Sequence, residues 1–187
     1  MNIKSIFAVA FMATALVGTT FSFASCDNDE KTVQENVVNI NGTYHTDLNI
    51  GGGKGDQTFH VMTIKDQQVK IVASQNNTFT LDFSGYETSD LPAKAPEQYI
   101  AQKPFRLTKV KATKLGDGTV KLTGEETVTM VIRSVNRTDK MEDVKFLDYP
   151  CTVYTQGTIK NGKIDITTRF RPGRMPVDII YTYVSQK

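Results

Sequence analysis

From about residue 40 onward, apolar and polar residues alternate with a period of two, and the pattern recurs to the C-terminus. Alternation rich in Val, Ile, Thr, Tyr and Phe is typical of strands with one buried face. No segment offers a helical stripe of apolar residues at i, i+3, i+4 and i+7. The alternating segments lie at 44–50, 69–73, 79–83, 120–122, 128–132, 164–170 and 177–183. The pattern therefore predicts an all-β domain.

Turn residues between these segments support antiparallel pairing. Asn161-Gly162 is the strongest hairpin signal, because both residues accept the positive φ of a type I′ turn. Asp117-Gly118 repeats the device, and Asn76-Asn77 and Asp66-Gln67 are weaker turn candidates. Short strands joined by tight turns indicate an antiparallel sandwich or barrel, and periodicity leaves both open.

A glycine-rich segment at 51–56 (Gly-Gly-Gly-Lys-Gly-Asp) could suggest a phosphate-binding loop. It lacks the four-residue spacer closed by Gly-Lys and a Ser or Thr, and no helix follows it. We expect a flexible hairpin loop instead.

The N-terminal segment has the three parts of a secretory signal. Lys4 is followed by an apolar run over 6–17, and Ala24 and Ser25 precede Cys26. Small residues before a cysteine are typical of a lipoprotein signal peptide, cut before Cys26 with acyl chains then added to that residue. The division predicted is a signal peptide at 1–25, a polar linker at 26–39 and a β domain at 40–187.

Asp27, Asn28, Asp29 and Glu30 follow the cysteine directly. This tract is either the start of a solvated linker or a signal for export to the cell surface. The acidic export signal of Bacteroidetes surface lipoproteins resembles it. We therefore expect a protein anchored to the outer membrane by its acyl chains and exposed at the surface.

The two cysteines allow one alternative. Cleavage after Ala24 by the general signal peptidase would leave Cys26 free to pair with Cys151. If Cys26 is acylated instead, Cys151 has no partner in the chain. Its apolar, strand-like surroundings then predict a buried core residue rather than a nucleophile.

Three segments resemble one family. They begin at Asn41-Gly42-Thr43-Tyr44, at Leu115-Gly116-Asp117-Gly118 and at Gln156-Gly157-Thr158-Ile159. With the leader and the acidic tract, they are similar to the calycin-like lipoproteins of Bacteroidetes. The resemblance implies a lipocalin-like antiparallel barrel of about 8–10 strands. It implies no catalytic residues.

Composition and chemistry exclude several function classes. The chain carries 22 basic and 20 acidic residues, a balance without the basic excess of nucleic-acid binding proteins. His45 and His60 lie in predicted strands without a second ligand at metal-binding spacing. No Ser-His-acid or Cys-His arrangement can be identified. We therefore expect no enzyme activity, no cofactor and no metal site.

Three arginines surround a Pro-Gly turn near the C-terminus: Arg169, Arg171 and Arg174. A guanidinium group binds carboxylate, phosphate or sulfate bidentately, so this segment is the candidate ligand-binding site. Arginines laid over apolar surface in a solvated turn are the alternative.

The sequence predicts a surface lipoprotein whose barrel binds a small apolar or anionic ligand, inside or at its mouth. The alternative is a protein- or glycan-binding or inhibitory module that acts through its loops. A filled interior would favour the module, and an open one the small-molecule carrier. The sequence identifies neither the ligand nor a protein partner.

Overall fold

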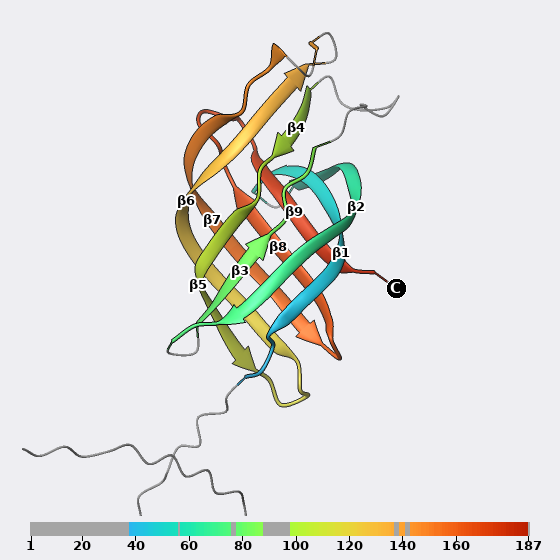
Figure 1. Ribbon diagram of the computed structural model, residues 1–187, viewed down its shortest axis with the longest axis vertical. Coiled ribbons are helices and arrows are strands. Elements are labelled where there is room, and N and C mark those ends of the chain that lie inside the picture. Colours follow the sequence, from blue (N-terminus) through green and yellow to red (C-terminus); the bar gives the residue numbers. More distant parts are fainter. Residues whose placement is uncertain are drawn as a thin grey trace, which may run out of the picture. The chain divides into compact units, whose positions relative to one another are not determined.

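The computed structural model describes residues 38–55, 57–75, 78–87, 98–136, 139–140 and 143–186, and these form nine strands (Figure 1). The strands are β1 (Gly42–Lys54), β2 (Gln57–Ala73), β3 (Thr78–Phe83), β4 (Gln98–Gln102), β5 (Phe105–Lys114), β6 (Val120–Asn136), β7 (Leu147–Lys160), β8 (Lys163–Phe170) and β9 (Asp178–Ser185).

Eight of these strands close into an antiparallel barrel. The order around the ring is β6-β5-β3-β2-β1-β9-β8-β7, and pairing of β6 with β7 completes it. Each strand pairs with its neighbour in sequence, except that β4 pairs with the far end of β6 instead of joining the ring. Of the two architectures that the turn pattern left open, the chain adopts the barrel, and the predicted fold class is confirmed.

The alternating apolar residues point inward, as predicted, and they fill the barrel. Phe83 stacks on Phe105 with ring centroids 4.5 Å apart and lies 4.8 Å from Tyr183. Phe170 and Tyr181 meet edge to face at 5.0 Å. Leu48, Val69, Ile71, Leu81, Leu122, Met130, Val153, Ile166, Tyr181 and Tyr183 each have 0% of their surface exposed. Full burial on so many inward positions means that the interior beside them is close-packed.

The hairpin between β7 and β8 turns as the sequence predicts. Asn161 and Gly162 have φ values of 52° and 73°, the positive pair that a type I′ turn requires. The turn between β5 and β6 differs, because positive φ occurs there only at Gly118. Asp117 instead accepts hydrogen bonds from the backbone N–H and the hydroxyl of Thr119. The prediction of a second type I′ turn at Asp117-Gly118 is therefore wrong, although the chain does turn there.

Two other expectations about turns are wrong. Asp66 has a positive φ of 57°, but it lies inside the continuous strand β2, where the register with β1 shifts, so it marks a bulge. The glycine run at 51–53 is strand rather than loop, because it pairs with β2 on one side and β9 on the other. Asn76-Asn77 lies outside the described residues.

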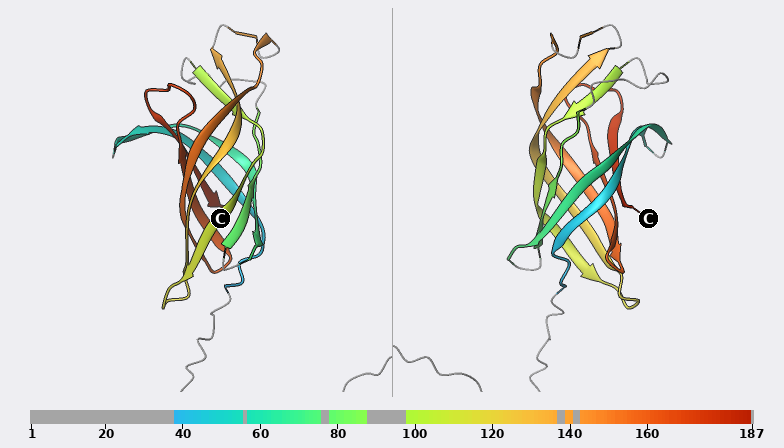
Figure 2. Two further views of the ribbon diagram at one scale, coloured as in Figure 1. Left: turned by 90° about the vertical axis from the view of Figure 1, so that its left-hand side faces the viewer. Right: turned by 45° about the vertical axis from the view of Figure 1, so that its right-hand side comes forward.

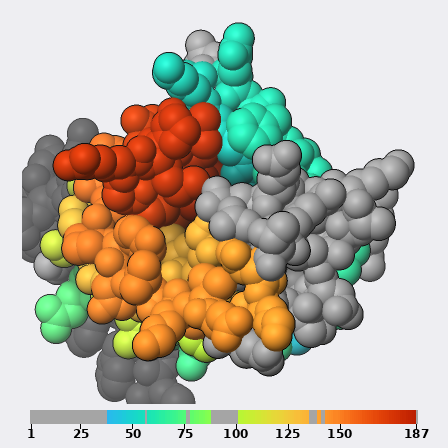
Figure 3. All heavy atoms as spheres, turned by 90° about the horizontal axis from the view of Figure 1, so that it is seen from above, coloured from blue at the N-terminus to red at the C-terminus, as the bar shows by residue number. Residues whose placement is uncertain are grey.

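The far end of the β1–β2 hairpin projects from the barrel. In Figure 2 this hairpin bends away from the wall formed by the other strands. In the view from above it stands out beside the red C-terminal segment (Figure 3). We call the paired ends of β1 and β2, residues 51–55 and 57–60, the arm.

Candidate functional site

The structure brings together two of the three predicted arginines. Arg171 Nε donates a hydrogen bond of 2.7 Å to Asp178 Oδ1, and Arg169 Nε lies 4.0 Å from Asp178 Oδ2. Arg174 is exposed in the turn between β8 and β9, and no ion pair to it occurs among the described residues. The predicted cluster thus consists of Arg169 and Arg171 on either side of one carboxylate.

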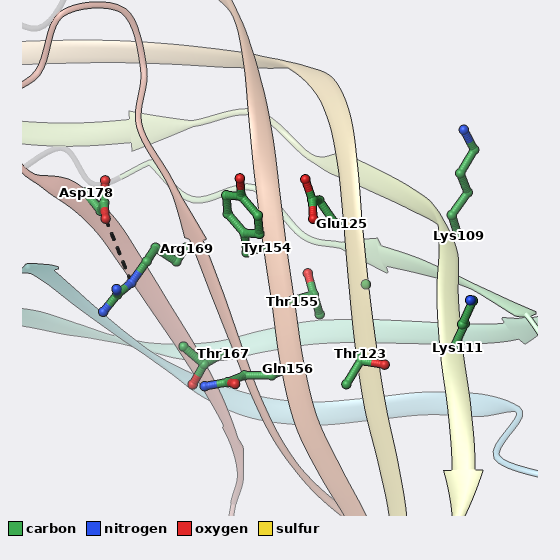
Figure 4. Close-up of a pocket in the computed structure, with 11 residues that line it drawn as sticks. Lys109, Lys111, Thr123, Glu125, Tyr154, Thr155, Gln156, Thr167, Arg169 and Asp178 are labelled. Carbon is green, nitrogen blue, oxygen red and sulfur yellow. Dashed lines mark ion pairs between the residues drawn. The ribbon is translucent and has the colours of Figure 1, made fainter. Parts of the chain in front are cut away.

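Arg169 lines a groove on the outer wall of the barrel. The groove holds about 1010 Å³ and crosses the outer face of β5 to β9 (Figure 4). Its charged and aromatic residues are Lys109, Lys111, Glu125, Tyr154, Arg169 and Asp178. We call it the outer groove. Three cations and two carboxylates line it, so it offers a mixed but slightly positive surface.

Arg169 also lines two smaller hollows beside the outer groove. One, of about 370 Å³, lies between the barrel wall and the arm residues Phe59 and His60. The other, of about 320 Å³, lies toward Arg171 and Cys151. Arg169 therefore lines three neighbouring concave surfaces.

The charge of Arg169 is only partly balanced. Asp178 accepts a hydrogen bond of 2.7 Å from Arg171, whereas its distance to Arg169 Nε is 4.0 Å, the limit of an ion pair. Arg169 Nη1 also donates a 3.4 Å hydrogen bond to the carbonyl of Gly55. The other guanidinium N–H groups meet no acceptor within the described part of the chain. An anionic group entering the groove can bind there through a charge-assisted hydrogen bond.

A bulge in β5 places Lys109 on the outer face. The register between β3 and β5 shifts so that Thr108 and Lys109 are both exposed. The carboxylate of Glu126 on β6 accepts hydrogen bonds from both backbone N–H groups and from the Thr108 hydroxyl. This carboxylate bridges the two strands above the point where their regular pairing ends, at Lys111 and Thr123.

The arm forms one side of the site. The ring of Phe59 packs over Gly52, where an added Cβ would lie 2.4 Å from it. Gly53 lies against Ile180 and the carbonyl of Gln57, which leaves similarly little room. The glycine run is thus explained by close packing of the arm. Phe59 remains 55% exposed above the hollow that Arg169 lines.

The barrel interior offers a different environment. The hydroxyl groups of Tyr86 and Tyr181 form a hydrogen bond of 2.9 Å, in which either can be the donor. Thr155 Oγ1, Thr168 Oγ1 and the Tyr183 hydroxyl are buried, and none has a hydrogen-bond partner among the described residues. Burial raises the pKa of Tyr183 well above its usual value. Thr168 and Tyr183 have no exposed surface, so no water-sized space adjoins them.

Other predicted candidates have local structural roles. Cys151 is buried, burial raises the pKa of its thiol, and its Sγ donates to the carbonyl of Tyr149. His60 Nε2 lies 3.1 Å from Thr63 Oγ1. Among the described residues, no group of three His, Cys, Asp or Glu side chains could hold a metal ion. Cys26 and the acidic tract at 27–30 lie outside the described residues.

Phe146, directly before β7, packs against two cations from other parts of the barrel. Lys103 and Arg133 lie 4.3 Å and 4.7 Å from the ring centroid of Phe146, a cation–π arrangement. Both cations also form ion pairs with Glu87. These groups fix the start of β7 beside β6.

The sequence did not single out the polar wall of the groove. Thr123, Tyr154, Gln156 and Thr167 occupy outward positions of β6, β7 and β8, where polar residues signal only contact with water. The register between paired strands places these residues side by side. This register is known from the structure and not from the alternation of residues in the sequence.

Comparison with known proteins gives a consistent picture of the fold. The family model of the calycin-like β-barrel domain matches residues 40–186. A crystal structure of a putative outer membrane protein from Bacteroides fragilis is similar, with a TM-score of 0.52 and 23% sequence identity. The match covers 79% of this chain and 51% of that one, so this chain spans about half the length of that protein. No protein with a curated description matches. No helix of the described residues is long and apolar enough to cross a membrane.

Proposed function

The chain belongs to the calycin-like β-barrel domain family, and we propose that it is a non-catalytic binding protein whose ligand occupies the outer groove. The observation that carries this proposal is the position of Arg169. This residue lines three neighbouring hollows, and its guanidinium group has hydrogen-bonding capacity that the described residues do not use. A fixed cation in a concave surface is a recognition element for an anionic group.

The packing of the barrel supports the outer wall over the interior as the binding site. A carrier of apolar molecules needs a cavity lined by inward side chains. Here Phe83, Phe105, Phe170, Tyr181 and Tyr183 occupy that space and contact one another. A ligand inside would have to displace several large aromatic residues from full burial.

The charge pattern supports a carboxylate, phosphate or sulfate group as the part of the ligand that meets Arg169. Lys109 and Lys111 have no ion pair among the described residues, so they add positive potential at the other side of the groove. Glu125 on β6 lies between these lysines and Arg169 on β8, and Asp178 on β9 lies beyond Arg169. This mixed surface suits a ligand that carries anionic groups together with neutral polar groups.

Titration with galacturonate and with inorganic sulfate, followed by calorimetry, tests the proposal. We expect weak binding by the unaltered protein and a loss of at least about tenfold in Arg169→Gln, because one charge-assisted hydrogen bond contributes about 1.5–3 kcal/mol. Arg174→Gln is the matched control, since it removes an exposed arginine outside the groove. Equal affinity of Arg169→Gln and the unaltered protein for both anions would refute the proposal.

The proposal includes placement at the cell surface. Cys26, with small residues before it and Asp27, Asn28, Asp29 and Glu30 after it, supports lipid anchoring followed by export. Metabolic labelling with a radioactive fatty acid should mark the full chain and not Cys26→Ser. Protease added to intact cells should remove the protein. Survival until the cells are lysed would contradict surface exposure.

A further inference from the structure

We propose that the ligand of the outer groove is an extended acidic polysaccharide that lies across the strands, with about one sugar over each strand. This inference rests on the proposed function, because it assigns a chemical class to the ligand that Arg169 recognises. The evidence is the arrangement of outward side chains along the strand register.

One row of polar residues crosses five strands. Lys111 on β5 is paired with Thr123 on β6, Thr123 with Gln156 on β7, Gln156 with Thr167 on β8, and Thr167 with Thr182 on β9. The first four line the outer groove, and Thr182 lines the adjoining hollow beside the arm. Neighbouring strands lie about 4.8 Å apart, so the row extends over roughly 19 Å. The spacing of about 4.8 Å between neighbouring strands is close to the length of one sugar residue in an extended chain.

The chemistry of the row suits sugar hydroxyl groups. Threonine hydroxyls and the glutamine amide can each donate and accept hydrogen bonds, as sugar hydroxyls do. Thr167 Oγ1 and Thr182 Oγ1 lie 3.1 Å apart, so adjacent strands present a fixed pair of oxygens. The side chains stand on paired strands of the barrel wall, which holds their spacing constant.

A second row, one step along the strands, supplies stacking and charge. Glu125 is paired with Tyr154, and Tyr154 with Arg169. The Tyr154 side chain is 52% exposed, so its ring can pack against the apolar face of a sugar. Arg169 beside it can bind a carboxylate on the same sugar or the next one.

The same wall is unsuited to an extended peptide. Such a peptide binds a sheet by adding a strand at a free edge, but at the groove β7, β8 and β9 are each paired on both sides. Where β5 and β6 part, the carboxylate of Glu126 already accepts the hydrogen bonds of the Thr108 and Lys109 N–H groups. A polysaccharide needs no free edge.

The test measures affinity as a function of chain length. Oligogalacturonates from the monosaccharide to about seven sugars are titrated into the full protein, with neutral cello-oligosaccharides of equal length as controls. We expect affinity to rise up to about five sugars, one for each strand that the row crosses, and then to level off. The neutral series should bind at least tenfold more weakly.

Variants separate this inference from the proposed function. The double variant Thr123→Val with Gln156→Leu should bind the long oligogalacturonates more weakly, with an affinity close to that for the monosaccharide. Its affinity for the monosaccharide itself should equal that of the unaltered protein. Arg169→Gln should weaken binding of both. Affinity that does not depend on length, with Arg169 still required, would overturn the polysaccharide and leave the anion site standing. Loss of the Arg169 dependence would overturn both, and equal binding of the neutral series would overturn the acidic assignment.

Discussion

The hydroxyl groups of Tyr86 and Tyr181 lie 2.9 Å apart inside the barrel and join the segment after β3 to β9. The two rings also meet edge to face, with centroids 5.9 Å apart. This contact links residues 95 positions apart in the sequence, in the part of the interior where the largest aromatic side chains gather. It shows how the centre of the barrel is filled by polar aromatic residues rather than left open.

Tyr86→Phe should therefore lower the free energy of unfolding by about 1 kcal/mol or somewhat more, because a buried hydroxyl loses a hydrogen-bond partner. Urea denaturation monitored by circular dichroism measures the change. Tyr154→Phe is the control, since its ring is outward and half exposed, and it should leave stability unaltered. Equal stability of Tyr86→Phe and the unaltered protein would show that the hydroxyl pair contributes nothing.

Thr168→Val should raise the free energy of unfolding by about 1 kcal/mol. The Thr168 hydroxyl is fully buried with no hydrogen-bond partner in the described part of the chain, and valine has nearly the same shape without a polar group to desolvate. The neighbouring Thr167→Val should instead be neutral or slightly destabilising, since its hydroxyl lies 3.1 Å from that of Thr182. A loss of stability in Thr168→Val would contradict the view that this buried hydroxyl is unsatisfied.

Gly157→Ala should destabilise the barrel by about 1–3 kcal/mol. An added Cβ there would lie 2.5 Å from the carbonyl oxygen of Asp165 and 2.8 Å from Ile166 Cα, and these backbone atoms cannot move without disturbing the β7–β8 pairing. Gly116→Ala is the matched control, because nothing lies within 4 Å of its added Cβ. Comparable unfolding midpoints for the two variants would contradict this explanation of Gly157.

Stability should fall in acid partly because of Asp117. A hydrogen bond from Lys160, with further bonds from the backbone and hydroxyl of Thr119, holds the pKa of Asp117 well below its usual value. A carboxyl whose pKa is lowered by folding contributes stability above its unfolded pKa of about 3.9, and this contribution is lost as the pH falls through the folded value. The stability difference between the unaltered protein and Asp117→Asn should thus be largest at neutral pH and vanish in strong acid. A difference independent of pH would contradict the ionic cause.

Local patterns predicted the elements of the fold better than its irregularities. Alternation at Phe79, Leu81 and Phe83 identified inward positions correctly, and all three are at most 3% exposed. The sequence predicts a flexible hairpin loop at 51–56, whereas Gly51–Gly53 is strand that pairs with β9 and leaves room for the ring of Phe59. The packing of the arm depends on residues distant along the chain, which period-two reasoning cannot represent.

The candidate site shows the same limit. Arg169, Arg171 and Arg174 were grouped because they are close in sequence, but strand β8 ends at Phe170 and places only Arg169 on the wall of the groove. Lys111, Thr123 and Gln156 join it through register between strands. Register depends on bulges such as the one at Thr108 and Lys109, which Glu126 stabilises from another strand. Such long-range hydrogen bonds leave no local signal.

The most direct test of the account is to locate a bound ligand by NMR. Isotope-labelled protein is titrated with an oligogalacturonate of about five sugars, matching the five strands of the row, and the backbone amide shifts are mapped. We predict that the largest shifts occur at Thr123, Gln156, Thr167 and Arg169, on the outer wall. Shifts confined to inward residues such as Tyr181 and Tyr183 would contradict the account and place the binding site inside the barrel.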